Sequence, residues 1–185
     1  MFGHLFGRGD EGKRIATALY GMIVAQARTP AFYASLGVPD TIRGRFEMVV
    51  LHTVLVVDSL GRRGEVGDAI GQRVFDRFCA DMDQSLRELG VGDLSVPRRM
   101  RQMAQGYYGR AEAYRRGLAA GNATTLAQAI GRNVFNSDDA APSAVLARYA
   151  LAAAGAIANA VSPEVSGAAL PFPDPAAFAE PVVAI

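Results

Sequence analysis

Residues 41–60 read TIRGRFEMVVLHTVLVVDSL, and this stretch decides the fold. Apolar side chains recur at helical spacing at positions 46, 49, 50, 54 and 57, and Met48, Leu51 and Leu55 make a second side apolar as well. A helix that is apolar on most of its sides has to be surrounded by other helices. The stretch therefore predicts the central helix of a bundle, with Asp40 or Thr41 as its N-cap.

The segments on both sides of this helix are also helical in pattern, and none alternates as a strand bounded by hairpin turns does. We expect helices over about residues 12–27, 68–89 (with Gly90 as its stop), 123–135 (capped by Asn122) and 142–161. Another opens at Ser95-Val96-Pro97, with Ser95 as N-cap, and ends at Gly121. Its side chains expected to face inward are Met100, Met103, Ala104, Tyr107, Tyr108, Ala111, Tyr114 and Leu118.

These segments predict an all-α fold, a single compact bundle of about six helices. We assign residues 1–161 to one helical domain, which suits a chain of 185 residues. Residues 162–185 hold five of the nine prolines and show no clear period. We expect this Pro/Ala-rich segment to be an extended or disordered tail, or to wrap around the bundle.

Composition excludes several classes of protein. A single cysteine, Cys79, rules out an intrachain disulfide and a cysteine-based zinc site, and the net charge of +1 predicts no nucleic-acid binding from bulk charge. We expect Cys79 to pack in the core with a raised thiol pKa, and His52 to be a hydrogen-bonded core residue. With only His4 and His52 available, no pair of histidines can be assigned to a haem, so we predict no bound cofactor and no metal.

The N-terminus, residues 1–9, lacks the long apolar region of a secretory signal. The most apolar stretches, 48–57 and 149–163, are shorter than a membrane-spanning helix requires. We therefore expect a cytoplasmic or equivalent reducing location, with peripheral membrane contact left open.

Charge is unevenly distributed along the chain. Residues 98–116 hold six arginines and one acid, a net +5, whereas residues 76–93 hold five acids and two arginines, a net −3. One interpretation is two solvated faces that pair with each other across the bundle. The other is a basic docking surface for RNA, anionic lipid head groups or an acidic partner segment, because arginine binds two phosphate oxygens at once.

A different hypothesis is a helical enzyme or small-molecule binder. Its pocket would be lined by Phe46, Phe75, Tyr107 and Tyr114. No catalytic motif supports this hypothesis, because the chain has no phosphate-binding loop, nucleophile elbow or dinucleotide fingerprint.

A series of ordered motifs between about residues 19 and 135 resembles the ubiquinol–cytochrome c chaperone family. The motifs span residues 23–30, 32–33, 37–41, 44–48, 51–52, 75–76, 81–83, 86–93, 96–97, 107–110, 113–114 and 132–134, with Met100 and Met103 between them. The chain begins almost at the matching core and has no long presequence rich in Arg and Ser, so it resembles a bacterial, cytoplasmic member of the family.

The resemblance implies a non-enzymatic assembly chaperone for ubiquinol–cytochrome c reductase (respiratory complex III). Mitochondrial relatives hold newly made cytochrome b at the ribosomal tunnel exit, together with a small second assembly subunit. The implied partners of this chain are therefore newly made cytochrome b or another complex III subunit, at the inner face of the inner membrane. A ribosome, an anionic membrane surface and a small second subunit are further possible partners.

Two groups of residues are candidates for partner binding. One is the basic face with Arg98, Arg101 and Arg110. The other is the region where small and polar residues interrupt the apolar pattern: Val38, Pro39, Asp40, Arg45 and Glu47. Arg45 and Glu47 could equally form internal salt bridges.

Overall fold

The structure is a computed structural model that describes residues 3–160 and 169–179. These residues form helices and loops and contain no strand, which confirms the predicted all-α bundle. The helices are α1 (Gly3–Ala27), α2 (Pro30–Ala34), α3 (Ile42–Gly61), α4 (Gly64–Glu88), α5 (Val96–Ala119), α6 (Ala123–Ile130) and α7 (Ala144–Ala160). A π-helical turn, Gly131–Phe135, follows α6, and 3₁₀ turns lie at Ala141–Ser143 and Pro175–Phe178.

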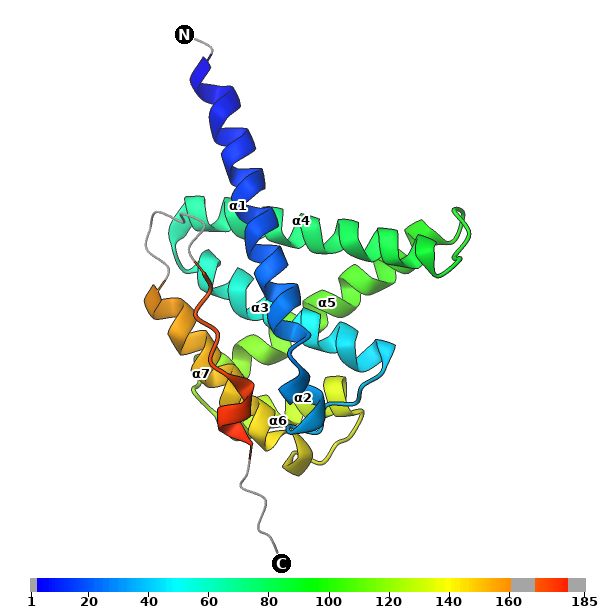
Figure 1. The fold of residues 1–185 in the computed structure, drawn as a ribbon, viewed down its shortest axis with the longest axis vertical. Coiled ribbons are helices and arrows are strands. Elements are labelled where there is room, and N and C mark those ends of the chain that lie inside the picture. Colours follow the sequence, from blue (N-terminus) through cyan, green and yellow to red (C-terminus); the bar gives the residue numbers. More distant parts are fainter. Residues whose placement is uncertain (1–2, 161–168, 180–185) are drawn as a thin grey trace, which may run out of the picture.

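Helix α3 is the centre of the bundle, as its sequence predicts. It contacts α1, α4, α5 and α7, and every residue from 47 to 56 is buried. Figure 1 shows it crossed by α1 on one side, with α4 and α5 running across the molecule. A helix in this position can be apolar all round because water reaches none of its sides over two and a half turns.

Three predicted helix ends have the expected local chemistry. The Thr41 hydroxyl accepts a hydrogen bond from the Gly44 amide at 3.0 Å, and the Asn122 side chain accepts one from the Thr125 amide at 3.0 Å. Each satisfies an amide that has no partner within its own helix. Gly90, after α4, has a φ of 78°, a left-handed conformation that glycine adopts without strain.

Several predicted boundaries are wrong. Helix α1 begins at Gly3 rather than Gly12, and its early turns project beyond the bundle (Figure 1). Helix α4 begins at Gly64 rather than Asp68. At Gly67 an added Cβ would lie 2.1 Å from the Leu60 carbonyl oxygen, so this glycine permits a close approach inside a helix instead of ending one.

Two predictions for the helix from 95 to 121 are also wrong. Ser95 is at the N-cap position of α5, but its side chain makes no capping hydrogen bond. Tyr108 is 57% exposed, although its ring lies against Phe75 with centroids 5.5 Å apart. In addition, the predicted helix 123–135 is regular only to Ile130 before the π-helical turn begins.

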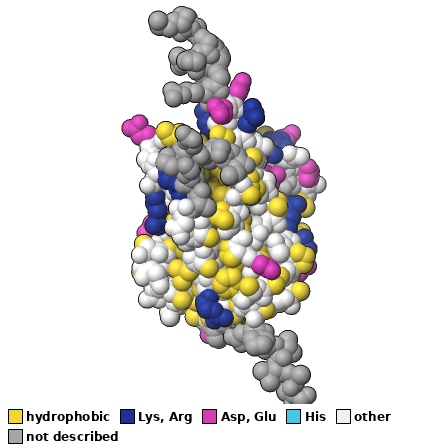
Figure 2. All heavy atoms as spheres, turned by 60° about the vertical axis from the view of Figure 1, so that its left-hand side comes forward, with side chains coloured by type: hydrophobic (Ala, Val, Ile, Leu, Met, Phe, Trp, Pro, Cys, Tyr) yellow, Lys and Arg dark blue, Asp and Glu magenta, His cyan; other side chains and the backbone are white. Residues whose placement is uncertain are grey.

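The described part of the tail packs against the bundle. Gln26 of α1 donates a hydrogen bond to the Pro173 carbonyl at 3.3 Å, and the Leu170 amide lies 3.2 Å from the Met22 sulfur. Residues 169–179 run alongside α7 in Figure 1. Figure 2 turns this side of the molecule, with α7 and the tail, toward the viewer and shows hydrophobic side chains down its middle. Residues 162–168 and 180–185 of the predicted tail lie outside the described residues.

His52 is a buried core residue with both ring nitrogens hydrogen-bonded, as expected. Its Nδ1 lies 2.8 Å from the Met48 carbonyl oxygen, which can only accept, so Nδ1 carries the proton. Its Nε2 therefore accepts from the Tyr149 hydroxyl at 2.8 Å, and that hydroxyl accepts from Gln26 at 3.1 Å. This chain of hydrogen bonds joins α3, α7 and α1.

Cys79 lies half-buried against the core, and burial raises the pKa of its thiol, in agreement with a packing role. Across residues 3–160 and 169–179, no helix combines the length and the apolar character needed to cross a membrane.

Candidate functional site

A groove of about 780 Å³ lies where α1, α3, α4 and α5 meet. Its apolar lining comes from all four helices: Val24, Ile42, Phe46, Val49, Met82, Leu86, Leu89 and Met103. Two of these side chains face solvent to an unusual degree, Ile42 at 76% and Leu89 at 66% exposure. Exposed apolar side chains gathered around a hollow indicate a binding surface, and methionine side chains adapt to ligands of irregular shape.

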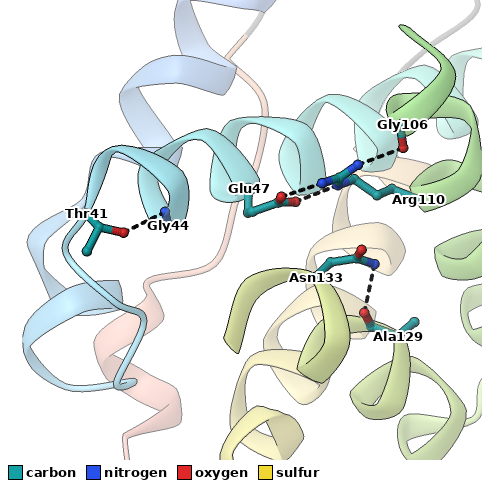
Figure 3. Close-up of polar contacts among 7 residues, drawn as sticks. All are labelled: Thr41, Gly44, Glu47, Gly106, Arg110, Ala129 and Asn133. Carbon is teal, nitrogen blue, oxygen red and sulfur yellow. Dashed lines mark hydrogen bonds and ion pairs between the residues drawn. The ribbon is translucent and has the colours of Figure 1, made fainter. Parts of the chain in front are cut away.

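An ion pair between Glu47 of α3 and Arg110 of α5 forms part of the groove wall (Figure 3). Arg110 donates from Nε and Nη2 to the two carboxylate oxygens at 2.7 and 2.6 Å, and from Nη1 to the Gly106 carbonyl at 2.9 Å. Glu47 is only 1% exposed, and its carboxylate raises the pKa of Arg110. A two-pronged contact of this kind fixes both side chains and holds α5 at a set distance from α3.

Arginines outnumber acids around the groove, and Asp81, an acid of its lining, accepts a hydrogen bond from the Tyr20 hydroxyl at 2.8 Å. Arg28 and Arg43 are exposed, and neither forms an ion pair with any residue in the described ranges. Arg45 also lines the groove, but it pairs with Asp40 at 2.6 Å. A neighbouring hollow of about 340 Å³ shares Arg28 and Arg45 with the groove and is lined further by Pro30, Tyr33, Ala34 and Asp40. An acidic group on a bound partner would find two free guanidinium groups at this rim.

Six of the eight predicted site residues fall into three places. Arg45, Glu47 and Arg110 line the groove, and Asp40 lines the neighbouring hollow. Arg98 and Arg101 are exposed but do not line the groove.

The remaining two predicted residues, Val38 and Pro39, fix the conformation of the loop before α3. Val38 is 2% exposed and belongs to the core. Pro39 is half-buried, and a Cβ at Gly44 would lie only 2.0 Å from its carbonyl oxygen, so this loop lies tightly against the first turn of α3. Both residues shape the segment that carries Asp40 and Arg45.

The two charged faces do not pair with each other as one interpretation of the sequence had it. Arg110 and Arg115 of α5 pair with Glu47 and Asp58, both on α3, and Arg87 of α4 pairs with nearby Asp83 and Asp93. Among the described residues, no arginine of α5 forms an ion pair with an acid of α4. The basic residues near the start of α5 therefore stay available.

Sequence reasoning missed most of the groove. Met82, Leu86 and Leu89 continue the apolar stripe of α4, and nothing in the sequence distinguishes them from the buried residues of that stripe. The stripe is real, but the last turns of α4 extend past the helices that would cover it. Arg28 and Ile42 carried no signal of their own, because a single exposed arginine or isoleucine is ordinary in a sequence.

The aromatic pocket suggested as an alternative is not formed. Of its four residues only Phe46 lines the groove, whereas Tyr107 and Tyr114 are 3% and 0% exposed. Phe75 packs against Tyr107 at an interplanar angle of 44°, with ring centroids 4.7 Å apart. Within the described ranges, no group of three or more His, Cys, Asp or Glu residues could hold a metal ion.

Comparisons with known proteins agree on one kind of relative. The family model described as "Ubiquinol-cytochrome C chaperone" matches residues 34–169. The ubiquinol-cytochrome-c reductase complex assembly factor 1 of Xenopus laevis is 23% identical over 139 residues, which are 74% of this chain and 69% of that protein. The crystal structure of the Cbp3 homolog from Brucella abortus has a TM-score of 0.82 and 35% identity, and covers 95% of this chain and 98% of the other.

Proposed function

The chain belongs to the ubiquinol–cytochrome c chaperone family, and from this premise we propose that it binds newly made cytochrome b during the assembly of respiratory complex III. Members of this family are assembly chaperones, so the chain acts by binding and not by catalysis. Its partner is a component of ubiquinol–cytochrome c reductase. The proposal places the contact with cytochrome b in the groove between α1, α3, α4 and α5.

The observation that carries this proposal is the apolar lining of an open groove. Ile42 and Leu89 are largely exposed to water in the unbound chain, and Met82 and Met103 lie with them along the groove. An apolar helix of a membrane protein needs such a surface until it reaches its final neighbours. Amphipathic helices bind in grooves of this kind through side chains spaced three and four residues apart.

Charged side chains at the rim of the groove would set the orientation of the bound segment. Arg28 and Arg43 at the rim have no acidic partner in the described part of the chain, so an acidic residue of the bound segment would pair with them. Glu47 and Arg110 keep the wall rigid, and the Asp40–Arg45 pair borders the entrance.

The setting is proposed as the cytoplasm, at the inner face of the inner membrane, where a membrane-protein subunit is inserted. A ribosome and a small second assembly subunit are further proposed partners of the same complex. Both can be detected in the same preparation as cytochrome b.

The test is deletion of the gene in its own host, with the haem spectrum and complex III activity of the membranes as the readout. Loss of the cytochrome b absorbance, restored by the wild-type chain, is expected. Ile42→Asp and Leu86→Asp place a carboxylate in the groove and should fail to restore it. Val66→Asp is the matched control, because Val66 is 64% exposed and does not line the groove.

Co-purification of cytochrome b with the tagged chain measures binding separately from the later assembly of complex III. Wild type and Val66→Asp should retain cytochrome b, and the two groove variants should lose it while unfolding at an unchanged denaturant midpoint. Unaltered cytochrome b in the deletion strain would refute the proposed function. Full restoration by both groove variants would refute the proposed site.

A further inference from the structure

The loop between α4 and α5 carries the most exposed large hydrophobic side chain of the described chain. Leu94 is 99% exposed, and Leu89, at the start of the same loop, is 66% exposed. Figure 1 shows that the ends of α4 and α5 and their connecting loop project away from the rest of the bundle. Two leucines in water at the end of a projecting hairpin are unfavourable unless they meet another surface.

The same hairpin end carries unpaired positive charge. Arg98, Arg99 and Arg101 are exposed, and none forms an ion pair within residues 3–160 or 169–179. The two acids near these arginines have other partners, since Asp93 pairs with Arg87 and Glu88 accepts a hydrogen bond from Gln84 and forms no ion pair with them. The arginines are therefore not neutralised by their neighbours.

The position of these arginines works against the stability of α5. The first turn of the helix holds no acidic residue, and Ser95 leaves its amides without a side-chain cap. A helix N-terminus has a partial positive charge, so added cations destabilise it and an anion stabilises it. An anionic partner at this end would relieve the unfavourable arrangement.

We propose that this hairpin end, Leu89 to Arg101, binds the surface of an anionic lipid bilayer. Leu94 enters the boundary between head groups and acyl chains, and Arg98, Arg99 and Arg101 bind lipid phosphates around it. An apolar tip with a basic collar has the chemistry of interfacial membrane contact. RNA would also attract the arginines, but it gives a fully exposed leucine no apolar environment.

This inference goes beyond the proposed function and does not depend on it. Leu89 lines both the loop and the groove, so lipid contact at the hairpin end would bring the groove next to the membrane surface. A membrane-protein segment leaving or entering the bilayer would then meet the groove directly.

The first experiment uses tryptophan as a reporter, because the chain contains none. Leu94→Trp, in the full chain, is mixed with vesicles of phosphatidylcholine and phosphatidylglycerol. A blue shift of its emission and quenching by brominated acyl chains are expected, with both effects weakened by salt and by omission of phosphatidylglycerol. Val66→Trp, at an exposed site at the other end of α4, is the control and should keep the emission of a tryptophan in water.

The second experiment measures vesicle binding by flotation. Replacing Arg98, Arg99 and Arg101 together by Gln should weaken binding by about 10-fold or more. The same replacement at Arg14, Arg132 and Arg148, which are exposed elsewhere, removes equal charge and should have a much smaller effect. Leu94→Asp should also abolish flotation without changing the denaturant midpoint.

Three results would overturn the inference. One is an unshifted Leu94→Trp spectrum in the presence of anionic vesicles. Another is equal loss of flotation in the two arginine triples, which would indicate bulk charge alone. The third is binding of an RNA oligonucleotide that depends on these arginines while vesicles are not bound. Ile42→Asp, which tests the groove, should float normally, so failure of one proposal leaves the other measurable.

Discussion

Arg110 on α5 donates two hydrogen bonds to the carboxylate of Glu47 on α3, at 2.7 and 2.6 Å, although 63 positions separate them in sequence. Glu47 is 1% exposed, whereas the Arg110 side chain keeps 23% of its surface in contact with solvent. The carboxylate has thus left water almost completely, and Arg110 is its charged partner. This pair joins the two motif segments 44–48 and 107–110 in space.

Arg110→Ala should destabilise the fold by about 3 kcal/mol, because it leaves the buried Glu47 carboxylate without its counter-charge. Urea unfolding followed by circular dichroism measures the change. Arg45→Ala is the matched control, since the Arg45–Asp40 pair has both side chains more than half exposed and should contribute little. Similar losses in the two variants would contradict the importance of burial.

Replacing Glu47 and Arg110 together by Gln and Met should recover most of that loss, because no uncompensated charge remains buried. The double variant should unfold within about 1 kcal/mol of wild type. If it is as unstable as Arg110→Ala alone, the cost lies in lost packing and not in the unpaired charge.

Acid should weaken the fold through His52. Burial lowers the pKa of His52 from 6.5 to about 4, so the folded state keeps the ring neutral while the unfolded state takes up a proton below about pH 6.5. Stability is therefore fully present above pH 6.5 and declines as the pH falls toward 4. The expected loss is about 2 kcal/mol at about pH 5.

The contribution of His52 is isolated by comparing two pH series of urea unfolding. His52→Gln should be less stable at neutral pH, because it alters the bonds to Met48 and Tyr149, but its stability should depend less on pH between 6.5 and 4. An identical pH dependence in both proteins would assign the effect to other groups, such as the carboxylates.

Gly44→Ala should destabilise the protein by about 2 kcal/mol or more, because its Cβ would lie 2.0 Å from the Pro39 carbonyl oxygen. Gly109→Ala is the control on another helix. Nothing lies within 4 Å of its Cβ position, so it should stabilise α5 by about 0.5–1 kcal/mol. Thermal unfolding of the two variants should therefore shift in opposite directions.

Phe172→Ala should loosen the described tail from the bundle. Its ring lies edge-on to His52 with centroids 5.3 Å apart, next to the bond from Gln26 to Pro173. We expect a loss of about 2 kcal/mol in urea unfolding. Leu94→Ala, at a side chain 99% exposed, should cost almost nothing, and equal losses would argue against packing of the tail.

Local signals in the sequence were sufficient for most of the fold. Asn122 predicts its cap, because the side chain needs only an amide three residues away, whereas at α3 the sequence left Asp40 and Thr41 open and the structure shows Thr41. Residues 41–60 predict the central helix because no solvent-facing side is left. The motifs also predicted the family, which the comparisons confirm. The prediction for Tyr108 was wrong because this residue lies at the edge of the apolar stripe, where periodicity alone cannot distinguish a partly exposed side chain from a buried one.

The sequence by itself determined the all-α class, the central helix, the helix cap at Asn122 and the family, because each depends on neighbouring residues or on their order. The tertiary structure alone decided which charges meet and which apolar residues stay uncovered. Arg110 faces Glu47 because α5 crosses α3 at that turn, and the stripe of α4 becomes a groove wall at Leu86 and Leu89 because its last turns extend past their neighbours. Helix length and crossing position result from packing over the whole bundle, and no local pattern encodes them.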